Sequence, residues 1–460
     1  MLFEGDFHFF DYFKINSNID FQFFCFNIKF TVCFSADKMD KVDPENFDNV
    51  SILPAEIKSF IFKDFVSREI LDLSLVSKSW YNSLGKITEC MDKIWLKFYS
   101  FRIKNIESLQ LTTRNYEKLK VNLLRTEKEF KTVSDLQICW KKVLIYNSEF
   151  ASKEIYNQFI QSFAETVVEL EISDVKIKVN NVINVEFEFP MLRRLFFRND
   201  PATALEVFLG KTNSLESLSF DIIQEVPEPS MTMNTVVMEF LKFNTKLTHL
   251  QLGPNMIKSI FAQADIKDDL KFQLKTLLLK FSMVGNLTVE IQENVENFIL
   301  AQTSLEWIFL WELKDEQILI KLWNELPNLK RITFSKLEIL FEDPMMLLLN
   351  PNENITQLDL HCKLLPLNQL KRVLGPNVAP NLTTLYLQKL EQPEMEYAAR
   401  TLQNLKTLEY EFIDEDVEDF YTNMKTSGDE TINRDITIKR RLIFDELVAP
   451  FALMPLFWKN

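Results

Sequence analysis

The chain has 460 residues, with 52 Lys and Arg against 66 Asp and Glu and a formal net charge of −14. Hydrophobic residues make up 47 %, which excludes wholesale disorder, and an acidic chain repels phosphate backbones, so no nucleic-acid partner is expected. Only 7 residues are glycine, and no GxxxxGK[ST], GxGxxG or GxSxG motif occurs. Nucleotide-binding loops and a hydrolase nucleophile elbow are therefore not expected.

Histidine and cysteine are too sparse for a metal or catalytic cluster. The three histidines form no close pair, and the cysteines include no CxxC: Cys25, Cys33, Cys90, Cys139 and Cys362. We expect no metal, no cofactor, no catalytic residue and no enzyme activity, and a reducing cytoplasmic or nuclear location. The N-x-[ST] sequons are then expected to carry no glycan: Asn49, Asn286, Asn354 and Asn381.

The first 38 residues hold 11 of the 41 phenylalanines. Acidic residues open this segment and polar residues interrupt it, so neither a secretory signal nor a membrane span is expected. Residues 21–34 suit a β-strand. Two interpretations of residues 1–38 stay open: they are a Phe-rich extension of the protein, or the protein truly starts at Met39. We expect residues 1–48 to be an extension and a polar leader, and assign them no function.

Residues 49–98 are predicted to form three short helices. Pro54 suits a first helical turn, and apolar residues follow it at helical spacing: Ile57, Phe60, Ile61 and Phe65. Ser67 is a predicted N-cap of the second helix, with Glu69 in its first turn. Gly85 is expected to end the third helix.

This segment resembles an F-box. The resemblance rests on residues whose order and spacing agree with the family pattern: Leu53, Pro54, Glu56, Ile57, Ile61, Phe62, Leu71, Leu75, Val76, Ser77, Lys78, Trp80 and Trp95. Phe65 departs from it, since leucine is commoner there. The resemblance implies docking on the SKP adaptor, and through it on a cullin–RING ubiquitin ligase. The implied adaptor contacts are Leu53, Pro54, Ile57, Ile61, Phe62, Leu75, Val76, Ser77 and Trp80.

The alternative is a helical cap whose apolar residues all pack inward. Three short helices cannot bury every Leu, Ile and Trp face by themselves. Exposed apolar surface is therefore expected, and such a patch usually marks a binding partner.

The rest of the chain repeats a strand pattern, apolar-x-x-apolar-x-apolar. Its first positions are Val167, Leu192, Leu215, Leu247, Leu274, Leu305, Leu329, Ile355, Leu382 and Leu405, with weaker matches from Tyr116 and Trp140. Helical patterns separate the strands, as in 288–302 and 315–326 and around Val236–Leu241. The spacing is typical of a leucine-rich repeat.

The predicted fold class is α/β, a leucine-rich-repeat solenoid with parallel strands on the concave face and helices on the convex face, preceded by the small all-α F-box-like module. We expect irregular first repeats or a linker in 99–165, and the solenoid with a C-terminal cap in 166–460. Leu447–Trp458 is the predicted cap. The asparagine usual after each strand is present at Asn255 but mostly missing elsewhere.

Alternation along the strand places Trp307, Phe309 and Trp311 on the concave face, and Arg331 and Asp359 follow on the next strands. Aromatic residues and arginine dominate binding hot spots, so these five residues are the predicted substrate-binding patch. Two alternatives stay open: a loop covers the aromatic residues, or a register shift of one residue makes them core.

Two charged groups are weaker candidates. The acidic run in 409–419 is either a second binding surface or a solvated face, and Arg193, Arg194 and Arg198 could bind an acidic segment or form structural ion pairs. By resemblance, the chain is a substrate-recognition subunit of an SCF-type E3 ubiquitin ligase that binds an unidentified protein substrate, with no membrane partner. The alternatives are a non-ligase leucine-rich-repeat scaffold and an enzyme with a site on the curved face.

Overall fold

The computed structural model describes residues 20–23, 28–31, 55–63, 65–74, 78–99, 116–136, 138–178, 187–198, 202–221, 231–262, 270–281, 288–311, 316–335, 351–361, 367, 370–371, 374–375, 378–413, 416–427 and 429–441. The chain divides into two compact units. The first comprises residues 1–95 and 102–116, and the second comprises residues 96–101 and 117–460.

The described residues of the first unit form a hairpin and four short helices. The strands β1 (Asp20–Phe23) and β2 (Ile28–Thr31) pair antiparallel, where the sequence suggested one strand. The helices are α2 (Ala55–Phe62), α3 (Ser67–Ser74), α4 (Lys78–Leu84) and α5 (Thr88–Met91). The three predicted helices are therefore present, and Gly85 directly follows α4 as expected.

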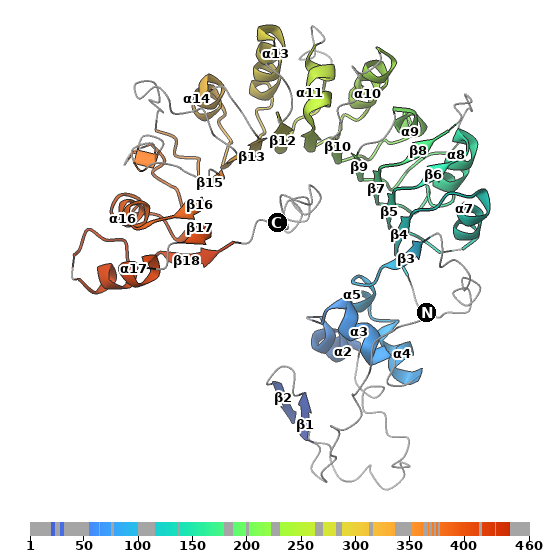
Figure 1. Cartoon of the computed structure of the whole chain (residues 1–460), viewed down its shortest axis with the longest axis horizontal. Coiled ribbons are helices and arrows are strands. Elements are labelled where there is room, and N and C mark those ends of the chain that lie inside the picture. Colours follow the sequence, from blue (N-terminus) through green and yellow to red (C-terminus); the bar gives the residue numbers. More distant parts are fainter. Residues whose placement is uncertain are drawn as a thin grey trace. The chain divides into compact units, whose positions relative to one another are not determined.

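The second unit is built on a 14-stranded sheet whose described strands follow one another in chain order and pair in parallel (Figure 1). Its strands are β3 (Leu96–Tyr99), β4 (Lys118–Asn122), β5 (Lys142–Tyr146), β7 (Glu169–Ser173), β9 (Arg194–Arg198), β10 (Ser217–Asp221), β11 (His249–Leu252), β12 (Thr276–Lys280), β13 (Trp307–Trp311), β14 (Arg331–Ser335), β15 (Gln357–His361), β16 (Thr384–Leu390), β17 (Thr407–Ile413) and β18 (Thr437–Arg440).

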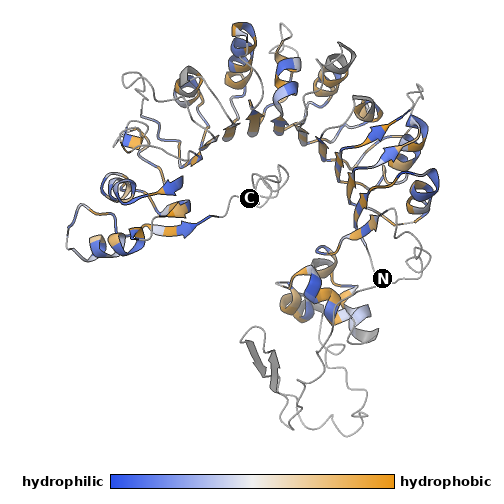
Figure 2. Ribbon diagram, viewed as in Figure 1, coloured by the Kyte–Doolittle hydropathy of each residue, from blue (hydrophilic) through white to orange (hydrophobic). Residues whose placement is uncertain are grey.

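Helices separate these strands and lie along one side of the sheet (Figure 1). They are α7 (Glu127–Ser134), α8 (Lys153–Gln161), α9 (Ala202–Leu205), the 3₁₀ helix η4 (Glu206–Phe208), α10 (Met231–Phe243), α11 (Pro254–Phe261), α13 (Val289–Leu300), α14 (Glu316–Glu325), α16 (Gln392–Thr401) and α17 (Val417–Thr426). Figure 2 shows hydrophilic and hydrophobic residues side by side along these helices, as expected for elements with one buried face.

The repeat pattern read from the sequence coincides with this sheet. Every predicted match from Tyr116 to Leu405 lies at one of the strands β4 to β17, and its second and third apolar residues are the second and fourth residues of that strand. In β13, for example, Ile308 and Leu310 are fully buried, as is Leu305 before the strand. Each such side chain contributes about 1.5–3 kcal/mol by burial. The leucine-rich-repeat solenoid is thereby confirmed.

The first repeats carry an additional feature after each strand. Leu123, Asn147 and Asp174 directly follow β4, β5 and β7, and all three have positive φ angles, between 44° and 61°. Asn and Asp tolerate this left-handed conformation, whereas it costs Leu123 about 1–2 kcal/mol. The turn leads into two short paired strands, β6 (Glu149–Phe150) and β8 (Lys176–Ile177).

An asparagine ladder links the later repeats at a position that the sequence pattern did not single out. In the repeats that begin at Leu329, Ile355, Leu382 and Leu405, an asparagine stands directly before this first apolar residue, and its side-chain N–H donates at 2.8 Å to a backbone carbonyl of the previous repeat. The pairs are Asn328–Thr303, Asn354–Pro327, Asn381–Glu353 and Asn404–Pro380. The sequons at Asn354 and Asn381 thus have their amides engaged in the fold.

Candidate functional site

The helix α2 has one anchored side and one exposed apolar side. Phe62 is only 2 % exposed, and its ring packs edge-to-face on Phe65 and Trp80 at centroid distances of 5.4 and 5.8 Å. By contrast, Ile57 is 47 % and Phe60 is 62 % exposed. Large apolar side chains at this exposure are candidates for contact with a partner.

The predicted adaptor contacts are distributed over both sides of this helix and beyond it. Ile57 is exposed, Ile61 and Trp80 are half-buried, and Phe62 is buried. The other predicted contacts lie outside the described residues: Leu53, Pro54, Leu75, Val76 and Ser77.

Hydrogen bonds around Lys93 hold the turn between α2 and α3. Its ammonium donates to the backbone carbonyls of Lys63 and Phe65, the latter at 2.8 Å. The Ser67 hydroxyl donates to the Lys93 carbonyl at 2.5 Å. Ser67 is the first residue of α3, and the Val66 carbonyl accepts the first helical hydrogen bond, so the prediction of Ser67 as the N-cap is wrong by one residue. Instead, the Glu69 carboxylate accepts a hydrogen bond from the Val66 N–H at 2.8 Å.

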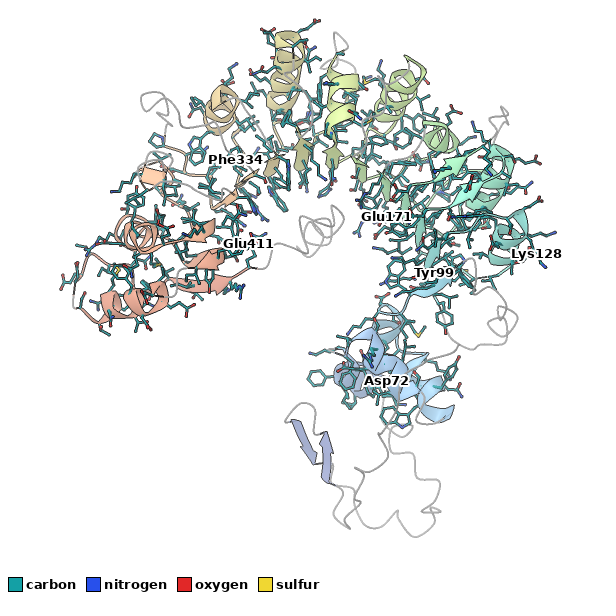
Figure 3. The ribbon with its side chains drawn as sticks, viewed as in Figure 1. Asp72, Tyr99, Lys128, Glu171, Phe334 and Glu411 are labelled. Carbon is teal, nitrogen blue, oxygen red and sulfur yellow. The ribbon has the colours of Figure 1, made fainter. Side chains whose placement is uncertain are left out.

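In the second unit, the side of the sheet away from the helices is formed by the first, third and fifth residues of the strands from β4 to β18, and by the second and fourth residues, Lys97 and Tyr99, of β3. We call this side the open face. Figure 3 shows Glu171, the third residue of β7, and Glu411, the fifth residue of β17, on this face. Lys128 of α7 points outward on the opposite side.

The strand β13 presents Trp307, Phe309 and Trp311 on the open face, as predicted from alternation. The two tryptophans are half-buried, but Phe309 is only 1 % exposed. Its neighbours across the sheet are Leu278 and Thr333, which are also buried. All three are the middle residues of their strands, so side chains of the neighbouring strands and of the same strand surround them. The expectation that Phe309 is exposed is therefore wrong, although its face is as predicted.

Arg331 and Trp307 form a stacked pair beside the buried Asp359. The guanidinium carbon lies 3.7 Å from the Trp307 ring centre, and Arg331 donates to Asp359 Oδ2 from Nε at 2.9 Å and from Nη2 at 2.5 Å. Thr333 links them, since its hydroxyl accepts from Trp307 Nε1 at 3.0 Å and donates to Asp359 at 3.1 Å. This network fixes the orientation of the exposed edge of Trp307.

Asp359 is fully buried and remains charged. Burial would by itself raise the pKa of its carboxyl, but Arg331 and Arg441 hold that pKa below its usual value. Arg441 Nη1 lies 3.7 Å from Asp359 Oδ1. Asp359 thus positions two arginines on the open face and has no exposed surface of its own for a partner.

His361 follows on the same face, and its ring contacts that of Tyr386 at a centroid distance of 4.5 Å and an interplanar angle of 35°. Burial lowers the pKa of its imidazole to about 4, so the ring is neutral at physiological pH. Among the described residues, no group of three or more His, Cys, Asp or Glu side chains is arranged to hold a metal ion. No helix in the described part of the chain is long and apolar enough to cross a membrane.

Three of the other charged candidates, Arg193, Arg194 and Glu409, form ion pairs within the fold. Arg193 lies 3.6 Å from Glu216, and Arg194 lies 3.4 Å from Glu169. Glu409 pairs with Arg441 at 3.1 Å. The partners Tyr386 and Arg441 were missed at the sequence level, although Tyr386 stands at an open-face position of a predicted strand.

Comparisons with known proteins find similarity to solved structures only. No protein-family model matches the chain, and no curated protein is significantly similar to it in sequence. Solved structures with a similar fold include the leucine-rich repeat-containing protein LegL7 from Legionella pneumophila, at 11 % identity and a TM-score of 0.40 over 73 % of this chain and 99 % of that chain. A chain of the yeast Rad7 and Elc1 complex has 13 % identity and a TM-score of 0.40 over 84 % and 92 %. The fold assignment rests on the strand order and register of the chain itself.

Proposed function

We propose that this chain is the substrate-recognition subunit of an SCF-type E3 ubiquitin ligase, in which the F-box-like helices dock on the SKP adaptor and the solenoid binds a protein substrate. The chain itself makes and breaks no bond. It acts by raising the concentration of a bound substrate near the ubiquitin-loaded enzyme.

One observation carries this proposal. The helix α2, which contains the Glu-Ile part of the F-box-like motif, exposes Ile57 and Phe60 while Phe62 holds the helix in place. Val66, before α3, is also 59 % exposed. A helix anchored on one side and apolar on the other supports docking on a partner better than inward packing alone.

The arrangement of the open face supports the substrate-binding part of the proposal. The half-buried Trp307 and Trp311 of β13 lie on the same face as Arg331 of β14, and hydrogen bonds hold Trp307 and Arg331 in place. Preorganised aromatic and arginine side chains are typical of binding hot spots.

The test is binding of the full chain to purified SKP adaptor, measured by calorimetry, with Ile57→Glu beside the unmodified chain. A carboxylate at this exposed apolar position should weaken adaptor binding at least tenfold, about 1.4 kcal/mol, because it would be desolvated in the complex. The folded state of each variant is checked by circular dichroism.

Val289→Glu is the matched control, since Val289 is 72 % exposed on α13 in the second unit. It should bind the adaptor within about twofold of the unmodified chain. An unmodified chain that does not bind the adaptor would overturn the proposal and favour a non-ligase scaffold.

A further inference from the structure

The open face has an unusual charge balance on its first strands. Six cationic side chains stand at open-face positions of β3 to β9, and together we call them the basic surface: Lys97, Lys118, Lys120, Lys142, Arg194 and Arg198. Only Glu169 and Glu171 oppose them at these positions of the described strands. The basic surface therefore carries an excess of positive charge, although the net charge of the whole chain is −14.

Neighbouring charges do not cancel this excess. At the strand entries, Lys141 pairs with Glu117 and Arg193 with Glu216, so these positions are balanced. At the strand exits, Asp174 adds one carboxylate after β7.

The two carboxylates on the face are themselves partly neutralised. Glu169 is shared between Lys142 and Arg194. Burial raises the pKa of the Glu171 carboxyl to about 7, so at neutral pH this group carries only part of its charge. The local field is therefore set by the cations.

The basic surface is accessible to a partner. Lys97 is exposed, Lys118 and Lys120 are half-buried, and the side chain of Arg194 is 33 % exposed. Lys120 Nζ also lies 4.6 Å from the centre of the Tyr146 ring, so an aromatic side chain is among the groups that a partner would meet.

The spacing of the cations indicates the form of the ligand. They extend over neighbouring strands from β3 to β9, about 19 Å across the sheet, and Arg194 and Arg198 are about 13 Å apart along their strand. A single phosphate group is too small to contact cations at these separations. A row of negative charges along an extended chain matches the distances between the cations.

We propose that the basic surface binds an extended protein segment rich in Asp and Glu. This inference rests on the proposed function in that the segment would belong to the substrate. It places the acidic part of a substrate on β3 to β9, away from the aromatic and arginine residues of β13 and β14.

The test is fluorescence anisotropy of a labelled peptide of about eight alternating Asp and Glu residues, extending about 27 Å, titrated with the full chain. Lys118→Glu together with Lys120→Glu should weaken binding at least tenfold, and binding should weaken as salt rises from about 0.05 to about 0.5 M. Lys118→Gln together with Lys120→Gln should give an intermediate loss, which separates charge from misfolding.

Lys128→Glu together with Lys131→Glu is the matched control, because both lysines are exposed on α7 and the change in net charge is the same. This variant should bind the peptide within about twofold of the unmodified chain. An equal loss in both reversal variants, or equal binding of an Asn/Gln peptide, would overturn the proposal. So would tighter binding of a singly phosphorylated neutral peptide or of single-stranded DNA.

Adaptor binding is measured on the same preparations without the peptide. Loss of adaptor binding with retained peptide binding would leave the acidic-ligand surface standing and remove the ligase role. Retained adaptor binding without peptide binding would remove the acidic-ligand surface and leave the ligase role standing.

Discussion

Two buried carboxylates on the open face are stabilised in opposite protonation states. Asp359 faces Arg331 and Arg441, and these cations keep its pKa low in spite of burial. Glu171 accepts a hydrogen bond from the Tyr146 hydroxyl, but burial dominates and raises its pKa to about 7. The difference is that Asp359 contacts guanidinium groups directly, whereas the cations near Glu171 act from a greater distance.

The raised pKa of Glu171 predicts a pH-dependent effect of Glu171→Gln on the free energy of unfolding. In the folded chain Glu171 binds its proton more tightly than the ordinary value of 4.5, so its favourable contribution is complete below pH 4.5 and is lost as pH rises through about 7. Glutamine is neutral throughout and keeps an oxygen for the Tyr146 hydroxyl. The variant should match the unmodified chain near pH 5 and be more stable by about 2–3 kcal/mol at pH 8.

Urea unfolding from pH 5 to 8 measures this difference. Glu306→Gln is the control, because Glu306 forms an exposed ion pair with Lys330 and its loss should cost less than about 1 kcal/mol at every pH. A difference between Glu171→Gln and the unmodified chain that does not change with pH would contradict the assignment.

At the scale of the repeat, Asn433 continues the asparagine ladder from one residue earlier in its unit, and its environment differs from that of the ladder. Asn433 is only 8 % exposed, and its side-chain nitrogen lies 2.8–3.1 Å from the carbonyls of Leu402, Gln403 and Leu405. Its side-chain oxygen accepts the Asp435 N–H at 3.1 Å. The earlier ladder asparagines are exposed and make one such bond each, so Asn433 secures the last unit of the sheet.

Asn433→Ala should therefore lower the free energy of unfolding by about 2–3 kcal/mol, because it removes a buried amide that donates to the backbone carbonyls of the previous unit. Asn381→Ala should cost only about 0.5–1 kcal/mol, since water replaces its bond to the Glu353 carbonyl. Thermal unfolding of the two variants gives the comparison. An equal loss of unfolding free energy in the two variants would contradict the stronger contribution expected from the buried Asn433.

At the scale of the whole molecule, the sheet register was predictable because it depends on burial alone. Leu305, Ile308 and Leu310 all face the core, and this spacing recurs in every predicted unit. The same spacing places the predicted substrate-binding residues on the open face.

The pattern did not predict the strands at both ends of the sheet. β3 begins at Leu96, inside the range assigned to the helical module, and β18 has Arg440 where other strands carry an apolar residue. End strands contact one neighbour and need fewer buried residues, so their pattern is weaker. The burial of Phe309 and the pairing of Asp359 were also not predictable, because they depend on side chains of adjacent units far away in sequence. The predicted cap Leu447–Trp458 lies outside the described residues.

Because each repeat contacts only its neighbours, damage near one end should stay local. Leu408→Ala removes a fully buried side chain from β17 and should cost about 2–5 kcal/mol in its own unit. Hydrogen exchange followed by mass spectrometry should then show faster exchange in β16 to β18 and unchanged exchange in β4 and β5. Ile308→Ala in β13 is the control, since its neighbours on both sides should lose protection. If Leu408→Ala raised exchange equally in β4 and β17, the sheet would unfold as one cooperative unit, and substitutions near β18 would alter the distant basic surface as well.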